Sequence, residues 1–370
     1  MTAMAMRIAE IEPILVEVPL KTPARGVHGP TAVQRSVLVR VAADGLEGWG
    51  NVDPSPGYSA MSAIEVHDAV ARLAPALRGG DPFNLHRALA IMDREIDERF
   101  EAKAAVEMAL CDLKARALGL PVHSLIGGAL RTEVSLNAWI GTVPPEQAAR
   151  EALEWAARGF TTAKIKVAGA TDEGIERVAA VRGAVGARLA LRVDFNESLA
   201  FAAAVPFIRR LMPYDLTLVE QPIPRADIAG LAEIRRAIDI PLMADERVTG
   251  PAALIEIIRR GAADIVKVKV MKQGGLLRAR QMIECAGAAG LRVVVGHGFG
   301  LTLSTLAEAA VAAASEAVLP GCEAVGPLKM AGDVVGDPVN LDDGVLRLSD
   351  SPGLGASIDA DALKRYRISR

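Results

Sequence analysis

The chain has 370 residues, with 42 Lys and Arg against 45 Asp and Glu, so its formal net charge is −3. Hydrophobic residues make up 51% and charged residues 24%, a globular composition that excludes a disordered chain. The near-neutral balance argues against a nucleic-acid binder, which normally carries a basic surplus. Three scattered cysteines favour neither a disulfide framework nor a zinc site and fit a reducing, cytoplasmic location.

No segment of the chain predicts export or membrane insertion. The N-terminus lacks a basic head followed by an apolar run, so we expect no signal peptide. No stretch reaches the ~18 uninterrupted apolar residues of a membrane span. We therefore expect a soluble protein that contacts neither membrane nor nucleic acid.

Residues 1–128 predict an α+β domain, a small antiparallel sheet followed by helices. Arg7–Val18 and Ser36–Ala42 are strand-like, and Asp44-Gly45 is a hairpin signal before Leu46–Gly50. Helical spacing then covers Ala60–Leu77, Leu85–Ile96 and Ala102–Leu118. Gly and Pro predict loops at 21–33 and 51–58, either of which could reach a neighbouring domain.

A different pattern repeats over residues 129–335, where short apolar runs alternate with amphipathic segments. The runs are Val134–Ile140, Thr162–Val167, Leu189–Asp194, Leu216–Glu220, Pro241–Asp245, Asp264–Lys269, Arg292–His297 and Cys322–Val325. Eight strands alternating with helices predict a parallel (β/α) barrel. A doubly wound open sheet is the alternative, with less support because no G-x-G-x-x-G opens a helix. Residues 336–370 are expected to pack back on the first domain.

Seven of these runs carry a charged residue or a histidine at or near the predicted end of the strand. They are Lys166, Asp194, Glu220, Asp245, Lys269, His297 and Glu323, spaced 24 to 28 residues apart. That interval is one βα unit, and the active sites of βα barrels lie at the carboxyl ends of the strands. The periodicity therefore predicts one site at one end of the barrel.

Three acids from consecutive strands, Asp194, Glu220 and Asp245, are expected to converge there. Uncompensated carboxylates would repel one another, and a hard divalent cation relieves the repulsion. Oxygen ligands without Cys or His favour Mg²⁺. The alternative is that each acid only pairs with a lysine or arginine at the barrel rim.

Two K-x-K pairs occupy the second and sixth predicted strands, Lys164 with Lys166 and Lys267 with Lys269. The strand period of two turns both members of a pair to the barrel interior. The second and sixth strands are opposed, so a substrate bound at the acids would have a lysine on each face. A lysine is protonated at neutral pH and therefore a poor base, but burial, a neighbouring lysine and a bound cation all lower its pKa and favour the neutral amine. The alternative is that the lysines only neutralise the acids.

Other residues carry weaker signals. His297 either contacts substrate or acts as a hydrogen-bonded spacer. Glu323 is expected to orient a lysine or contact substrate, and Gly274-Gly275 opens a helix whose amides could bind an anion. The further candidate substrate contacts are Asn196, Arg25, His28 and Tyr58.

Motifs along nearly the whole chain resemble the enolase superfamily, muconate-lactonizing (muconate cycloisomerase-like) subgroup. They are Gly48-Trp49-Gly50, Ala105–Leu110 with Asp112, Lys164-Ile165-Lys166, Asp194-Phe195-Asn196, Glu220-Gln221-Pro222, Asp245-Glu246, Lys269–Gly275, Glu323–Leu328 and Pro352–Gly355. The resemblance implies an α+β capping domain over a modified (β/α)7β TIM barrel. It also implies Mg²⁺ on Asp194, Glu220 and Asp245, acid/base catalysis by Lys166 and Lys269, and Lys164 as an electrostatic helper.

The shared step in such enzymes removes a proton next to a carboxylate and gives a metal-stabilised enolate. The chain departs from the pattern at Asn51, where the family usually has Glu, at His297–Gly300 on the seventh strand, and in lacking the Asp-x-Asp of dipeptide epimerases. We expect a racemase or epimerase of an amino-acid derivative, with a muconate-type cycloisomerase, a syn-dehydratase or a non-enzymatic carboxylate-binding scaffold as alternatives. We also expect a homo-oligomer and a small carboxylate substrate.

Overall fold

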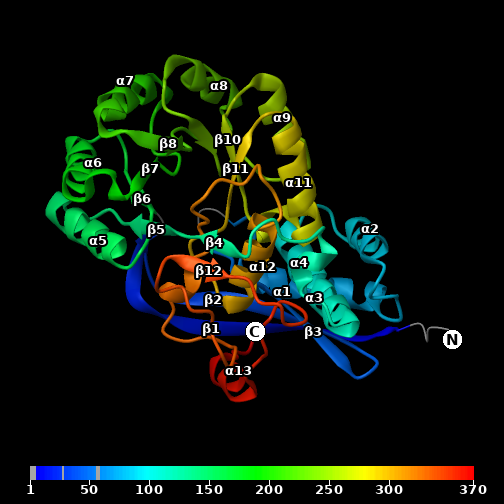
Figure 1. Ribbon diagram of the computed structural model, residues 1–370. Helices are drawn as coiled ribbons and strands as arrows, with labels where there is room; N and C mark the ends of the chain where they lie inside the picture. Colours follow the sequence, from blue (N-terminus) through cyan, green and yellow to red (C-terminus); the bar gives the residue numbers. More distant parts are fainter. Residues whose placement is uncertain (1–5, 27–28, 56–58) are drawn as a thin grey trace.

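The computed structural model describes residues 6–26, 29–55 and 59–370, apart from the side chains of residues 24–26, 29 and 30. Its N-terminal part is a three-stranded antiparallel sheet followed by helices (Figure 1). The strands are β1 (Ile8–Gly26), β2 (Gly29–Ala43) and β3 (Leu46–Val52), and the helices are α1 (Ala63–Leu77), α2 (Leu85–Glu95), α3 (Phe100–Leu118) and α4 (Val122–Leu125). The Asp44-Gly45 hairpin is confirmed, since both residues have the positive φ that such a turn requires.

The second part is a parallel sheet whose seven strands are neighbours in sequence order. They are β5 (Asn137–Ile140), β6 (Thr162–Lys166), β7 (Ala190–Asp194), β8 (Leu216–Glu220), β9 (Leu242–Ala244), β10 (Ile265–Val268) and β11 (Arg292–Val295). A doubly wound sheet would reverse this order at its centre, so that alternative is wrong.

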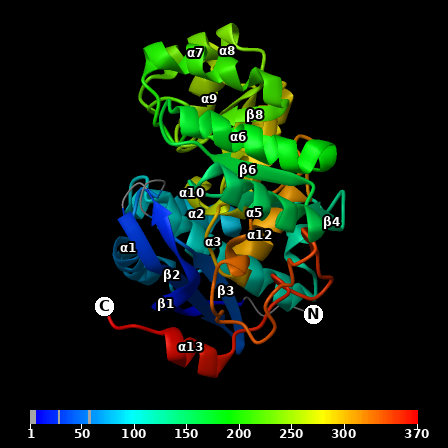
Figure 2. The same cartoon turned by 90° about the vertical axis from the view of Figure 1, so that its left-hand side faces the viewer.

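Helices pack around the outside of this curled sheet (Figures 1 and 2). They are α5 (Pro145–Ala157), α6 (Asp172–Val185), α7 (Phe201–Leu211), α8 (Ile228–Ala237), α9 (Pro251–Arg260), α11 (Leu276–Ala288) and α12 (Thr302–Ala312). The short helix α10 (Val270–Gln273) directly follows β10 and contacts α3. The fold is thus a modified TIM barrel with an α+β cap.

The eighth predicted strand, Cys322–Val325, does not form a regular strand. Cys322 N donates to Ser135 O, Asn137 N donates to Cys322 O, and Glu323 N donates to Val295 O, each at 2.8 Å. This segment therefore closes the barrel between β11 and β5. The 3-10 turn at Gly326–Leu328 follows at once, so the extended segment is too short to form a regular ladder of strand hydrogen bonds.

The predicted loop at 21–33 is also wrong. β1 continues to Gly26 and β2 begins at Gly29, with Arg25 paired to Pro30. The glycines and the proline suggested a loop, but an antiparallel partner supplies the hydrogen bonds, and Pro is tolerated at the start of a strand. Asn51 and Val52 likewise belong to β3 rather than to a loop.

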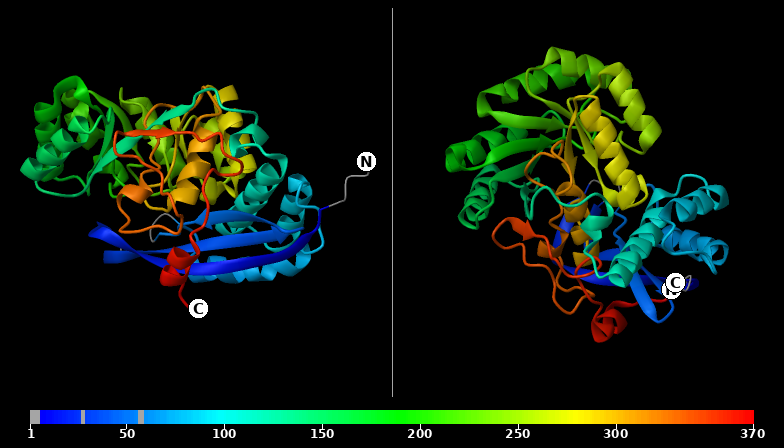
Figure 3. Two further views of the ribbon diagram at one scale, coloured as in Figure 1. Left: turned by 60° about the horizontal axis from the view of Figure 1, so that its bottom comes forward. Right: turned by 45° about the vertical axis from the view of Figure 1, so that its right-hand side comes forward.

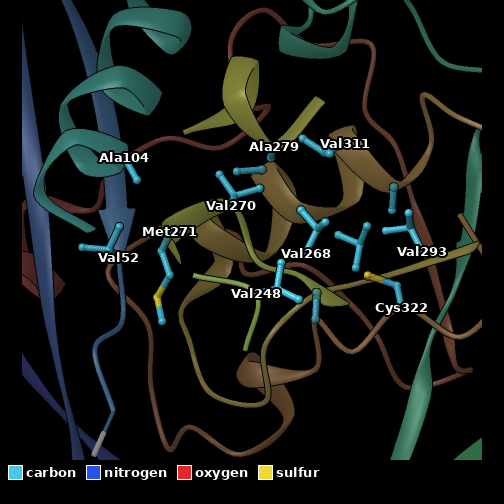
Figure 4. Close-up of a cluster of buried hydrophobic side chains, with 14 of the residues drawn as sticks. Val52, Ala104, Val248, Val268, Val270, Met271, Ala279, Val293, Val311 and Cys322 are labelled. Atoms are coloured by element: carbon cyan, nitrogen blue, oxygen red, sulfur yellow. The ribbon is translucent and has the colours of Figure 1, made fainter. Parts of the chain in front are cut away.

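Helix α3 lies between the capping sheet and the barrel, and almost all of it is buried. Gly48 and Gly50 allow β3 to approach it, because a Cβ at either position would lie about 2 Å from the carbonyl oxygens of Ala109 and Ala105. The apolar core is continuous across this contact (Figure 4): Val52 and Ala104 lie beside Met271 and Val270, and these lie beside barrel residues such as Val268.

The C-terminal segment contacts both parts of the molecule (Figure 3). β12 (Val345–Arg347) pairs with β4 (Glu133–Ser135) at the start of the barrel, and α13 (Ala360–Tyr366) packs on β1. Within the described ranges, no helix has the length and apolarity to cross a membrane.

Candidate active site

Asp194 and Glu220 are the last residues of β7 and β8 and are register partners, and Asp245 directly follows β9. All three side chains are buried. Parallel strands bring their carboxyl ends to one edge of the sheet, so the three acids share one side of the barrel mouth.

Lysines contact all three acids. Lys166 Nζ, on β6, lies 2.6 Å from Asp194 Oδ2, and Lys269 Nζ, just past β10, lies 2.7 Å from Asp245 Oδ2. In the sheet, β6 and β10 are separated by β7, β8 and β9, the strands that lead to the acids. The lysines therefore reach the acids from two opposite sides.

Lys164 lies deeper in the barrel. Its Nζ is 3.0 Å from Glu220 Oε2, 3.1 Å from Asp194 Oδ2 and 2.5 Å from Glu323 Oε2. Burial alone would lower the pKa of Lys164, but these carboxylates outweigh burial and raise it well above its usual value. Lys164 is thus a fixed cation, which suits an electrostatic role.

The pKa values of the acids are shifted by burial and by neighbouring charges. Burial, followed by repulsion from Asp194, raises the pKa of Glu220 to about 8. Burial opposes ionisation of Asp245 as well, but Lys269 and Lys272 hold its pKa well below the usual value. Lys272 Nζ lies 3.4 Å from Asp245 Oδ1. Burial therefore opposes ionisation of these carboxyl groups, and the neighbouring lysines favour it.

Within the described ranges, no three Asp, Glu, His or Cys side chains lie together as a ready-made metal cage. A lysine ammonium contacts each acid instead. The donor chemistry still fits a hard divalent cation: the donors are buried carboxylate oxygens from adjacent strands, and Glu220 is destabilised by its neighbour. Nearby, Glu246 Oε2 is buried and has no hydrogen-bond partner, as expected of a carboxylate held beside a cation.

Asn196 belongs to this cluster. Its Oδ1 accepts from Lys166 Nζ at 2.5 Å, and its Nδ2 donates to Glu246 Oε1 at 3.0 Å. It has a φ of 43°, in the left-handed region that asparagine tolerates better than most residues. Asn196 therefore links Lys166 to the acids.

His297 lies between two carboxylates at the junction with the cap. Its Nε2 is 3.5 Å from Asp53 Oδ2, and its Nδ1 is 3.3 Å from Glu308 Oε1. Burial would lower the pKa of His297, but the two carboxylates outweigh burial and raise it to about 9. Neither ring nitrogen has a hydrogen-bond partner within the described residues, so the contacts of His297 with the two carboxylates are ionic.

Glu323 lies at the eighth position of the barrel and contacts Lys164 and Lys267. Arg192 NH1 is 3.9 Å away. Despite burial, these cations hold the pKa of Glu323 far below its usual value. Glu323 thus contacts both interior lysines, as expected of a residue that orients them.

Three candidates from the cap cannot be placed at the site. Arg25 lies in β1, but its side chain is outside the description, and His28 and Tyr58 lie wholly outside the described residues. Sequence reasoning missed Lys329, whose Nζ lies 4.3 Å from the ring centre of Trp139 and 4.4 Å from that of Phe299. Lys329 follows the Gly326–Leu328 turn and lies outside the regular series of strand-end charges, so the sequence pattern did not point to it.

Comparison with known proteins agrees with this architecture. Residues 10–127 match the mandelate racemase/muconate lactonizing enzyme N-terminal domain, and residues 147–362 match the enolase C-terminal domain-like family. The chain belongs to the enolase superfamily. Enzymes of this superfamily are generally Mg²⁺-dependent.

The curated relatives are isomerases. The chain is likewise an isomerase, and it belongs to the subgroup of the superfamily that resembles muconate-lactonizing enzyme. It is 32% identical over 368 residues both to muconate cycloisomerase 1 of Rhodococcus opacus and to N-succinyl-L-Arg/Lys racemase of Bacillus cereus, covering 98% of each chain. The structure of muconate lactonizing enzyme from Pseudomonas fluorescens, complexed with muconolactone, superposes with a TM-score of 0.94 at 30% identity, covering 98% of this chain and 100% of that one. These equal identities do not select one reaction for this superfamily member.

Proposed function

We propose that this isomerase is a Mg²⁺-dependent racemase or epimerase acting on a small carboxylate, an amino-acid derivative. The observation that supports it is the approach of Lys166 and Lys269 to the acids from two sides. Stereochemical inversion at Cα needs a base on one face and an acid on the other.

Asp194, Glu220 and Asp245 would hold the ion, which when bound would neutralise charge on the substrate carboxylate. One lysine, as the free amine, takes the Cα proton onto Nζ. The opposed lysine returns a proton to the other face. Lys164 remains protonated beside Glu220 and supplies positive potential where negative charge develops.

A muconate-type cycloisomerase is the second candidate, and Glu323-x-x-Gly-Pro-Leu favours it because that run resembles the cycloisomerases. In such an enzyme one lysine suffices as base, and the other acts only as a cation. A homo-oligomer remains part of the proposal, and light scattering of the purified protein tests it.

The deciding experiment is proton NMR in D₂O with Mg²⁺, using N-acyl amino acids, dipeptides, proline derivatives and muconates. For its substrate, the wild-type enzyme should exchange the Cα proton of both enantiomers. Lys166→Ala should lose exchange of one enantiomer and Lys269→Ala that of the other, each by ~10²–10⁴. Both variants should lose racemisation.

The two variants control each other, since each retains one base. Exchange of both enantiomers persisting in either variant contradicts the opposed-lysine mechanism. Exchange of a single stereoisomer that depends on one lysine points to the cycloisomerase.

A further inference from the structure

Lys329 is held in an unusual setting at the barrel mouth. Its ammonium lies between the rings of Trp139 and Phe299 and donates to Gly298 O at 2.6 Å. Its backbone is fixed by the capping sheet, because Lys21 N donates to Lys329 O at 2.8 Å. Two aromatic faces and one carbonyl thus position this charge.

The charge of Lys329 is not neutralised by a carboxylate. In the part of the chain that the structure describes, no carboxylate oxygen lies within 4.0 Å of its Nζ, whereas every other lysine of the site contacts one. Burial, with repulsion from Lys166 and Lys164, lowers the pKa of Lys329 to about 7. An anion beside it would relieve this repulsion.

Lys329 lies across the barrel mouth from the three acids. Trp139 lies on β5, Phe299 follows β11, and Lys329 follows the Cys322–Glu323 segment that closes the barrel between them. The three acids come from β7, β8 and the end of β9, across the mouth. Trp139, Phe299 and Lys329 are all partly exposed, so a ligand can contact them.

We propose that Lys329, with Trp139 and Phe299, is a specificity-determining site that binds an anionic group at the end of the substrate remote from its reacting carboxylate. This deepens the proposed function and rests on it, since it assumes that the reacting carboxylate lies at the acids. The substrate class is then a diacid, or an amino acid whose N-acyl group ends in a carboxylate. The aromatic faces pack against the chain between the two charged ends.

Binding to the Mg²⁺-loaded protein tests the proposal without turnover. The probes are succinate, glutarate and adipate, each compared by calorimetry with its monomethyl ester, which removes one charge at nearly constant shape. We expect the wild-type protein to bind at least one diacid more tightly than its ester by about tenfold or more, the value of a hydrogen bond between charged groups. Lys329→Met should abolish that preference, because diacid affinity falls to about that of the ester.

Lys364→Met is the matched control, because Lys364 is exposed on α13 and the substitution removes the same charge. Lys329→Arg, which keeps the charge, should retain part of the preference, and thermal unfolding of each variant checks its folding. Equal affinity of the wild-type protein for diacids and esters, or a preference that survives Lys329→Met, overturns the proposal. Failure of Cα exchange with every compound would instead count against the proposed reaction, since binding needs no proton transfer.

Discussion

At the scale of single residues, the site is a set of charges that depend on one another. Glu220 is completely buried, lies beside Asp194, and forms ion pairs with Lys164 and Lys267. Removing any one charge leaves its buried partners with less compensation, which is costly. The lysines therefore have two functions, balancing the acids and, in the proposed mechanism, moving protons.

Glu220→Gln should weaken Mg²⁺ binding by about tenfold or more, because a charged oxygen ligand becomes neutral. The reduced repulsion with Asp194 works in the opposite direction but does not restore the lost ion–carboxylate attraction. Isothermal calorimetry with Mg²⁺ measures the change. Glu233→Gln, on the exposed face of α8, is the control and should bind like wild type. Unchanged affinity in Glu220→Gln would mean that Glu220 is not a ligand.

At the scale of elements, one carboxylate joins the cap to a barrel helix. The Gly274-Gly275 pair opens α11, and the anion at its N-terminus is Glu107 of α3. The Glu107 oxygens accept from Leu276 N at 2.8 Å and Leu277 N at 2.9 Å. Unsatisfied helix amides and the helix dipole favour negative charge at this end. Burial raises the pKa of Glu107 to about 7 despite these bonds.

Glu107→Gln should lower the free energy of unfolding by about 1–3 kcal/mol at pH ~4.5 and below. The loss should shrink as pH rises through about 7, because ionising a carboxyl whose folded pKa is raised costs the wild-type protein stability there. The amide oxygen can replace one acceptor, but its NH₂ group would face a backbone N–H, donor against donor. Urea unfolding followed by circular dichroism measures the loss. Glu146→Gln, exposed in the first turn of α5, should change stability by no more than about 0.5 kcal/mol. Equal losses in both variants would contradict a special role for the buried carboxylate.

At the scale of the whole molecule, the cap and barrel meet over a buried polar cluster as well as an apolar core. Asp53 accepts from Ser36 Oγ on the cap and from Ser304 Oγ on α12, each at 2.5 Å. His297 adds the positive charge between Asp53 and Glu308. A protonated His297 would therefore offset the charge of the two carboxylates at the junction.

His297→Gln should destabilise the protein most at low pH. The folded pKa of His297 is raised to about 9, above the ~6.5 of an unfolded histidine, so its contribution is fully present below ~6.5 and is lost as pH rises through about 9. The contribution is on the order of 3 kcal/mol, from a shift of that size. Unfolding free energies of wild type and variant, measured across this window, should converge toward its upper end.

His86→Gln, exposed on α2, should follow the wild-type curve throughout. A constant gap between wild type and His297→Gln over the window would show that His297 does not hold a proton between the two carboxylates.

The sequence by itself determined the order of strands and helices and the positions of the strand-end charges. Each is a local property: apolar runs such as Leu216–Glu220 recur once per βα unit, and parallel strands place their last residues at one edge. The tertiary structure alone decided the rest. The hairpin at Gly26 and Gly29, the irregular eighth position at Cys322, the carboxylates around His297 and the aromatic faces around Lys329 all depend on partners from other elements. Such contacts leave no period in the sequence, because the chain brings together residues that no local pattern relates.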